Sequence, residues 1–240
     1  MSKYSYNPRK FDENRPNVGV TIAPFVYNQD KNEINVLVYK RNEDAEVFPG
    51  EYALSNHFYD IKEHETLEVA AASALSEKSN IEIPHMKKFN VYSGNYIDPE
   101  RINTVNVAYY AILKHKEVII KDPLKEYNSK WLPIDEACNI VSAFNHKEIL
   151  IDAYKELKEV STHSNIVFDL LPDEFTITEL QSLLELLMET KLDKARFRGR
   201  IKKYGVLEKK EGFRTGPFRP AQLYSKNKEF KGNFYPKTIS

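Results

Sequence analysis

Apolar and polar positions follow two different periods along the chain, and each change of period marks a new element. Residues 17–27 and 32–41 are rich in β-branched side chains and flank a polar stretch, which predicts two strands joined by a hairpin. In the second strand Ile34, Val36 and Val38 alternate with their neighbours and predict one buried face. Further strands are predicted over residues 88–92, 104–113, 118–121 and 130–133, and helices over residues 66–79, 134–141 and 146–160.

Two more helices are predicted in the last third of the chain. Thr176 and Glu179 have the spacing of a capping box and predict the start of the first. Asp193 is suited to cap the second, which ends near Gly205. The apolar face of the first helix recurs at helical spacing and consists of Ile177, Leu180, Leu184 and Leu187.

A β-hairpin is predicted after the second helix. Residues 206–209 and 221–224 are short strand candidates. The loop between them, residues 210–220, is rich in glycine, proline and cations. Helix, turn, helix and hairpin is the element order of a winged helix-turn-helix.

The second helix has the residues of a DNA-reading helix. Phe197, Ile201 and Tyr204 cluster on one side and are expected to face a core. The opposite side holds Ala195 and Gly199, and a glycine inside a helix costs about 1 kcal/mol relative to alanine, so close approach of a partner would explain it. A helix in the DNA major groove is such a case. The candidate DNA-binding residues are Lys194, Arg196, Arg198, Gly199, Arg200, Lys202, Lys203, Arg214 and Arg219.

Charge is distributed unevenly along the chain of 240 residues, although the net charge is zero. Residues 191–240 carry 15 Lys and Arg and 4 Asp and Glu, a net charge of +11, whereas residues 1–190 carry 20 and 31, a net charge of −11. A basic segment on an acidic body is typical of an attached polyanion-binding module. The last residues, 224–240, show no apolar face for a membrane surface.

The polar run over residues 161–165 is the predicted domain boundary, which divides the chain into residues 1–160 and 161–240. The beginning of the chain lacks the apolar region of a secretion signal, and no apolar run reaches the roughly 18–20 residues of a membrane helix. The single cysteine, Cys138, excludes an intrachain disulfide. We therefore expect a cytoplasmic protein.

Several motifs resemble the Nudix-related transcriptional regulators, which fuse a Nudix-like effector domain to a C-terminal winged helix. The resemblance covers about residues 17–224 and implies an α+β protein: a Nudix-like α/β/α sandwich with a mixed sheet, followed by a winged helix-turn-helix domain. Many members repress genes of NAD metabolism in response to ADP-ribose, and others respond to sugars. The motifs are Leu37-Val-Tyr-Lys-Arg41, Phe48-Pro-Gly50, Asp98-Pro-Glu-Arg101, Val107-Ala-Tyr-Tyr-Ala111, Ala143-Phe-Asn-His146, the run from Leu170 to Gln181, Leu192-Asp-Lys-Ala-Arg-Phe-Arg198 and Arg219-Pro-Ala-Gln-Leu-Tyr224.

The catalytic signature of Nudix hydrolases, G-xxxxx-E-xxxxxxx-R-E-U-x-E-E-x-G-U, is degenerate here. Glu65 and Glu77 are its remnants, whereas the arginine–glutamate pair is replaced by Ser73 and Ala74, and the last glutamate by Lys78. Mg²⁺ binds hard carboxylate oxygens, and pyrophosphate hydrolysis needs several of them from this helix. The sequence therefore predicts a catalytically silent domain without a metal site or cofactor.

Effector contacts are expected where the family has its pocket. Lys78 introduces an ammonium that attracts a phosphate, and the loop with Asp98 and Arg101 borders the pocket in the resembling family. These three residues are the candidate ligand-binding residues. Histidines at positions 57, 64 and 85 lack the spacing of a zinc site.

We interpret the chain as a ligand-responsive DNA-binding regulator, a repressor and homodimer, that binds a double-stranded DNA operator and an ADP-ribose-like nucleotide or a sugar. Two winged helices reading two half-sites favour a dimer. One alternative is an active Nudix hydrolase of nucleoside-diphosphate derivatives. Another is an adaptor that uses the winged helix for protein contacts.

Overall fold

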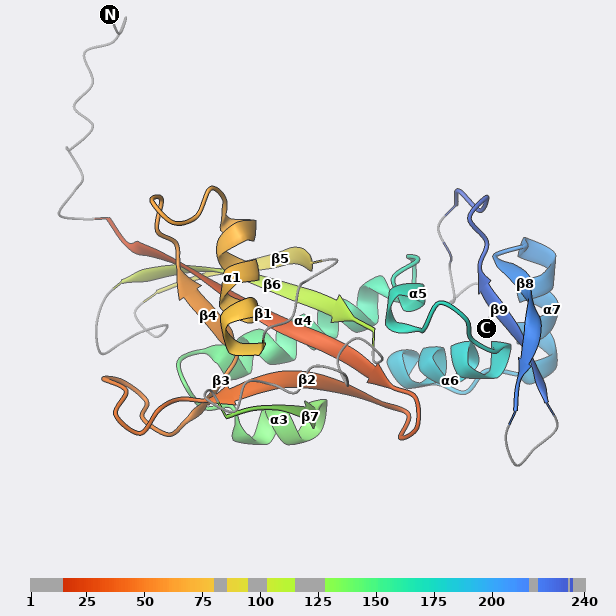
Figure 1. Cartoon of the computed structure of the whole chain (residues 1–240), viewed down its shortest axis with the longest axis horizontal. Helices are drawn as coiled ribbons and strands as arrows, with labels where there is room; N and C mark the ends of the chain where they lie inside the picture. Colours follow the sequence, from red (N-terminus) through yellow and green to blue (C-terminus); the bar gives the residue numbers. More distant parts are fainter. Residues whose placement is uncertain are drawn as a thin grey trace, which may run out of the picture.

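The computed structural model describes residues 15–79, 86–94, 103–114, 128–215, 220–232 and 234. In this part of the chain seven strands form one sheet with the central order β3-β2-β1-β6-β5, in which β4 also pairs with β1 and β7 with β2 (Figure 1). The pair β1–β6 is parallel and the others are antiparallel, so the sheet is mixed. The strands are β1 (Asn17–Asn28), β2 (Glu33–Lys40), β3 (Tyr52–Ala53), β4 (Ser55–Phe58), β5 (Met86–Ser93), β6 (Thr104–Leu113) and β7 (Ser129–Pro133).

Helices cover both faces of this sheet. α1 (Leu67–Ser79) packs on one face through Ala70, Ala71 and Leu75, in a cluster with alternate residues of β1. α3 (Ile134–Ile140) and α4 (His146–Val160) contribute to the core on the other face, where the remaining β1 residues and the predicted face of β2 lie. This is the predicted α/β/α sandwich, and the alternation of β1 and β2 residues between two cores follows from the period of a strand.

The boundaries of most predicted elements are confirmed within one or two residues, and two local differences have tertiary causes. β3 and β4 were not predicted, because each is short and is stabilised by partners distant in sequence: β4 pairs with the start of β1 and β3 with the end of β2. Asn145 is the N-cap residue of α4, but its side chain makes no capping hydrogen bond. The predicted strand over residues 118–121 lies outside the described residues.

The last third of the chain folds as a winged helix-turn-helix, at the right of Figure 1. The elements follow the predicted order, and the segment before α6 pairs with the wing, because Phe175 and Tyr224 exchange backbone hydrogen bonds of 2.9 and 2.8 Å. The wing is thereby fixed to the start of α6. The elements are α5 (Val167–Leu170), α6 (Ile177–Met188), α7 (Lys194–Tyr204), β8 (Leu207–Arg214) and β9 (Ala221–Lys226).

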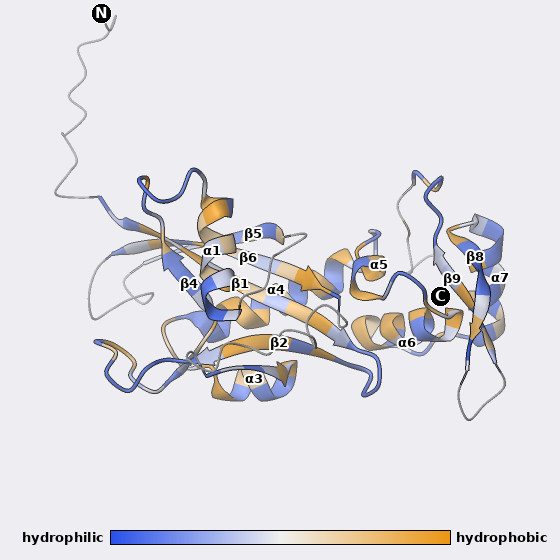
Figure 2. Ribbon diagram, viewed as in Figure 1, coloured by the Kyte–Doolittle hydropathy of each residue, from blue (hydrophilic) through white to orange (hydrophobic). Residues whose placement is uncertain are grey.

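One continuous core crosses the predicted domain boundary. It runs from Leu157 and Val160 at the end of α4 through Val167 to Leu180 of α6, and in Figure 2 the hydrophobic colour runs along β2 and is strong again in α6. Ser161 is buried, and its hydroxyl donates to the Leu157 carbonyl at 2.7 Å. The polar residues after α4 thus satisfy the last carbonyls of that helix, and they do not form an exposed linker.

Two ion pairs also join the halves: Lys114 with Asp173, and Lys158 with Glu189 at 2.7 Å. Across the part of the chain that the structure describes, the helices are too short or too polar to cross a bilayer.

Candidate nucleic-acid interface and effector region

α6 begins at the predicted capping box, which the structure confirms. The Thr176 hydroxyl accepts from the Glu179 N–H at 3.1 Å, and the Glu179 carboxylate accepts from the Thr176 N–H at 2.7 Å. Arg214 joins this motif from β8: its Nε lies 3.2 Å from Glu179 Oε1, and a terminal nitrogen donates to the Glu174 carbonyl at 3.1 Å. Arg214 therefore holds the wing against α6, and a DNA contact through it stays a prediction.

The turn between α6 and α7 is held by side chains of α6. Glu185 accepts hydrogen bonds from the Leu192 N–H at 3.0 Å and from Gln181 at 2.9 Å, and Gln181 also donates to the Leu192 carbonyl. Burial of Glu185 acts to raise the pKa of its carboxyl, but the hydrogen bonds from Leu192, Gln181 and Lys191 outweigh it, so the pKa is lowered. This carboxylate joins the end of α6 to the residues just before α7.

α7 begins as predicted at Asp193, whose carboxylate accepts from the Arg196 N–H at 2.8 Å. Phe197 and Ile201 face the core, with 0% and 2% of their surface exposed. The expectation for Tyr204 was wrong: it is 50% exposed, because the helix ends there and Gly205 turns the chain away with φ +62°.

The opposite side of α7 faces solvent. A Cβ added to Gly199 would meet no atom within 4 Å, so packing within this chain does not require a glycine at this position. Ala195 beside it is also exposed. Around this strip of small residues lie the exposed cations Lys194, Arg196, Arg198, Lys202 and Lys203, together with the partly buried Arg200.

The wing is longer than its sequence suggested. β8 extends to Arg214, so Lys210 and Arg214, which were expected in the loop, lie in a strand. The extension follows from cross-strand pairing that resumes after an irregularity, with Phe213 opposite Gln222. The candidate residue Arg219 lies outside the described residues.

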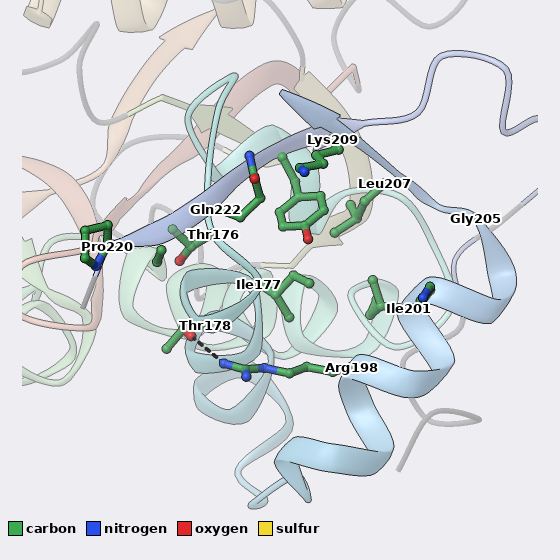
Figure 3. Close-up of a pocket in the computed structure, with 13 residues that line it drawn as sticks. Thr176, Ile177, Thr178, Arg198, Ile201, Gly205, Leu207, Lys209, Pro220 and Gln222 are labelled. Carbon is green, nitrogen blue, oxygen red and sulfur yellow. Dashed lines mark hydrogen bonds between the residues drawn. The ribbon is translucent and has the colours of Figure 1, made fainter. Parts of the chain in front are cut away.

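A groove of about 840 Å³ separates the wing from the two helices (Figure 3). Its floor includes Ile177, Ile201 and Leu207, and Arg198 extends across it from α7 to the Thr178 hydroxyl of α6 at 3.5 Å (Figure 3). Cations at the edge of an apolar groove suit a sugar–phosphate chain, since phosphates attract the cations and deoxyribose contacts the apolar floor. The cations that line the groove are Arg198, Lys202 and Lys209.

In the Nudix-like domain, the positions of the degenerate signature on α1 make contacts within the chain. Ala74, which replaces a signature glutamate, is fully buried. Glu77 lies 3.4 Å from His57 Nε2 and 3.8 Å from Lys78 Nζ. Glu65 is exposed at the loop before the helix. Among the described residues, no group of three or more His, Cys, Asp and Glu side chains is placed to hold a metal ion.

Two cations and two aromatic rings gather where β2 ends, and we call these residues, Tyr39, Arg41, Lys78 and Phe144, the cation–aromatic cluster. Lys78 Nζ lies 5.5 Å from the ring centre of Tyr39, and the Arg41 guanidinium lies 5.0 Å from that of Phe144. Burial raises the pKa of the Tyr39 hydroxyl, and the neighbouring Arg41 acts to lower it. The Tyr39 ring is buried and the Phe144 ring half-buried. Cations beside aromatic rings can attract a phosphate and stack on a nucleobase.

A buried polar network lies beside this cluster. His146 accepts from the Leu54 N–H at 3.2 Å, and its other ring nitrogen lies 3.5 Å from the Thr21 hydroxyl, which also bonds to Asn106. Burial, and then the charge of Arg41, lower the pKa of His146 to about 3. His146 is therefore neutral at physiological pH and acts as a structural residue.

Comparison with known proteins agrees with this architecture. Residues 167–225 match the family model of the NrtR DNA-binding winged helix domain. The chain is similar to the crystal structure of Shewanella oneidensis NrtR complexed with a 27mer DNA, with 25% identity, a TM-score of 0.78, and coverage of 90% of this chain and 97% of that chain. The chain thus has the domain organisation of the Nudix-related regulators, a Nudix-like domain followed by a winged helix.

One further relative matches most of the chain, and another matches its first domain. The ADPR responsive transcriptional repressor NtrR of Acinetobacter baylyi is 27% identical over 209 residues, which are 87% of this chain and 82% of that protein. The NUDIX domain of Shewanella oneidensis NrtR complexed with ADP ribose superposes with a TM-score of 0.53 and 22% identity, over 65% of this chain and 99% of that chain. The latter likeness shows the fold of the first domain.

The structure brings some predicted site residues together and leaves others apart. The α7 cations gather on one exposed helix, and Lys78 lies within the cation–aromatic cluster. Asp98 and Arg101 lie outside the described residues, so their role stays a prediction. Arg41 was missed, although it ends the motif Leu37-Val-Tyr-Lys-Arg41, because only the fold places it beside Tyr39.

Proposed function

We propose that this chain is a dimeric, ligand-responsive DNA-binding repressor whose Nudix-like domain, residues 1–160, senses an ADP-ribose-like nucleotide or a sugar and whose winged helix, residues 161–240, binds an operator. The main observation for DNA binding is the exposed strip of Ala195 and Gly199 between cations, because the open space beside it allows the helix to enter a DNA groove. The relatives named as an ADPR responsive repressor and as a DNA complex support the partners.

Operator titration tests the DNA-binding part. Selection from random duplexes supplies the operator, and binding is then measured over a range of salt concentrations. If part of the α7 cations of both subunits meets phosphates, log K falls with log salt by about 6–10 ion releases per dimer. Arg200→Ala weakens binding, whereas Lys62→Ala on the Nudix-like domain does not. A slope near zero would contradict DNA binding through α7.

The effector part rests on the cation–aromatic cluster, in which Lys78 and Arg41 offer positive charge beside aromatic rings. ADP-ribose, NAD and pentoses are titrated against the free protein by calorimetry, and against the operator complex. A coupling of about 1–3 kcal/mol changes operator affinity about 5–150-fold. Lys78→Ala, Arg41→Ala and Arg101→Ala weaken the response. Lys155→Ala, which removes an exposed cation of α4, is the matched control.

Catalytic silence is supported by what occupies the signature positions. The buried methyl group of Ala74 supplies no ligand, and the Lys78 ammonium repels Mg²⁺ where a carboxylate would bind it. AMP release from ADP-ribose is measured with Mg²⁺ and with Mn²⁺. A kcat of about 1–10 s⁻¹, the range of typical enzymes, would favour the active hydrolase instead.

The dimer is proposed because a symmetric protein matches two operator half-sites. Light scattering of the free protein is expected to give a mass twice that of the 28.0 kDa chain.

A further inference from the structure

The chain continues beyond the winged helix along an ordered path. Asn227 anchors this path to the end of α7: its N–H donates to the Val206 carbonyl and its side-chain amide to the Gly205 carbonyl, both at 2.9 Å. The same side chain accepts from the Glu229 N–H at 3.0 Å and closes a turn. The chain therefore leaves the C-terminal end of α7 with a fixed direction.

The path ends at the predicted domain boundary. Phe234 is 2% exposed, and its ring lies 5.4 Å from that of Phe168 in α5. Its N–H donates to the side-chain carbonyl of Asn165 at 3.1 Å, and the Asn165 amide donates to the Gly232 carbonyl at 3.2 Å. One asparagine between α4 and α5 thus binds the returning chain at two points.

The aromatic contacts continue into the wing. Phe168 lies between Phe234 and Phe175, at 5.4 and 6.0 Å between ring centres. Phe175 in turn pairs with Tyr224 of β9. The returning segment and the wing therefore meet at the same short helix, α5, which has only four residues and makes few helical hydrogen bonds of its own.

We propose that residues 227–232 and Phe234 form a C-terminal brace that sets the angle of α7 relative to the Nudix-like domain, with Asn165 and Phe234 as positioning residues. The inference rests on the proposed function, because the angle of α7 in each subunit sets the distance between the two recognition helices of a dimer. The brace lies beyond residue 225, where the match to the winged helix family model ends. It has anchors at both ends, one at the recognition helix and one where the two domains meet.

The angle is tested first in the free protein. Spin labels at positions 62 and 202, in a Cys138→Ser background, report the distance between the Nudix-like domain and α7. Phe234→Ala and Asn165→Ala are expected to broaden this distance distribution and to speed amide exchange over residues 161–168 by about 10-fold or more, because a local contact that limits opening is lost. Phe234→Leu is expected to show most of the broadening and most of the faster exchange. Glu229→Ala, which removes an exposed side chain of the same segment, is expected to behave as wild type.

Operators with altered spacing test the consequence. Wild type is expected to prefer one half-site spacing by about 10-fold over spacings one base pair longer or shorter, and Phe234→Ala by less than about 3-fold, while a single half-site is bound equally by both. An unchanged label distance in both variants, or faster exchange with unchanged spacing preference, would overturn the brace. If wild type binds no duplex, the proposed function fails, and the label distances still decide whether the brace holds α7.

Discussion

Inside the Nudix-like domain the Thr21 hydroxyl bonds to both Asn106 and His146, whereas the polar residues of α7 point outward around a glycine. Helix α1 of the Nudix-like domain and helix α7 of the winged helix differ likewise in which of their residues face inward and which face outward. α1 packs through its buried alanines and carries Glu77 and Lys78 where the signature has two glutamates, whereas α7 buries only Phe197 and Ile201 and carries outward cations. The packed face of a helix follows from the fold, so the outward face is the better indicator of function.

The largest expected effect is at Gly199. Gly199→Leu is expected to reduce operator affinity by about 100-fold or more, because the side chain keeps the helix backbone away from bases whose contacts contribute about 1–3 kcal/mol each. The fold is expected to gain about 0.5–1 kcal/mol from helix propensity, since the space around Gly199 is open. Duplex titration and thermal unfolding measure both. Gly199→Ala is the milder control, and wild-type affinity in Gly199→Leu would remove the steric role of this position.

The buried network predicts a pH dependence of stability. Burial lowers the pKa of His146 to about 3, below the usual 6.5 of an unfolded histidine. Below pH 6.5 the unfolded chain binds a proton that the folded chain does not, so stability is complete above this pH and falls by about 3 kcal/mol on going to pH 4. Urea unfolding between pH 7 and pH 4 measures this. His146→Gln is expected to flatten the dependence, and equal slopes in both proteins would contradict the assignment.

A leucine at a buried alanine of α1 is expected to lower stability and leave operator affinity unchanged, the opposite of a leucine at Gly199 in α7. Ala74 is fully enclosed, so Ala74→Leu overpacks the core and is expected to cost about 1–3 kcal/mol of unfolding free energy. Operator affinity of the folded protein is expected to stay near wild type. Denaturant unfolding and duplex titration on the same sample measure stability and affinity. A loss of affinity without a loss of stability would contradict a purely structural role for Ala74.

A smaller effect is expected at Glu185, a half-buried carboxylate of α6 that bonds to the turn between α6 and α7. Glu185→Gln weakens the bonds to Leu192 and Lys191 and is expected to cost about 1 kcal/mol. The hydrogen bonds outweigh burial and lower the pKa of Glu185, so its contribution is present above the unfolded value of 4.5 and is lost as pH falls below it. Unfolding at pH 7 and pH 3.5 compares variant and wild type, whose difference is expected to shrink at the lower pH.

The helix caps could be predicted from the sequence because each depends only on residues close together in the chain. The Thr176–Glu179 capping box and the Asp193 cap each involve residues three apart, so the hydrogen bonds could be inferred from spacing. β4 and the extension of β8 depend on partner strands and could not be inferred in this way. The burial of Phe234 could not be inferred either, because its partner Phe168 is distant in sequence.

The same limit applies to the site. The α7 cations could be predicted because a single helix presents them, as its period requires. Arg41 could not, because its position beside Tyr39 depends on how β2 ends and on the packing of Phe144 from another segment. Arg214 was predicted from charge alone, and the partner that holds it, Glu179, comes from the preceding helix.

The continuous core between α4 and α6 determines how the molecule loses its structure. Leu157 and Val160 share one apolar cluster with Val167 and Leu180, so neither half can open without exposing the side chains of the other. Elements that bury one another's surface unfold together, as in small single domains. Heating is therefore expected to give one calorimetric transition, in which the Nudix-like domain and the winged helix unfold as a single cooperative unit.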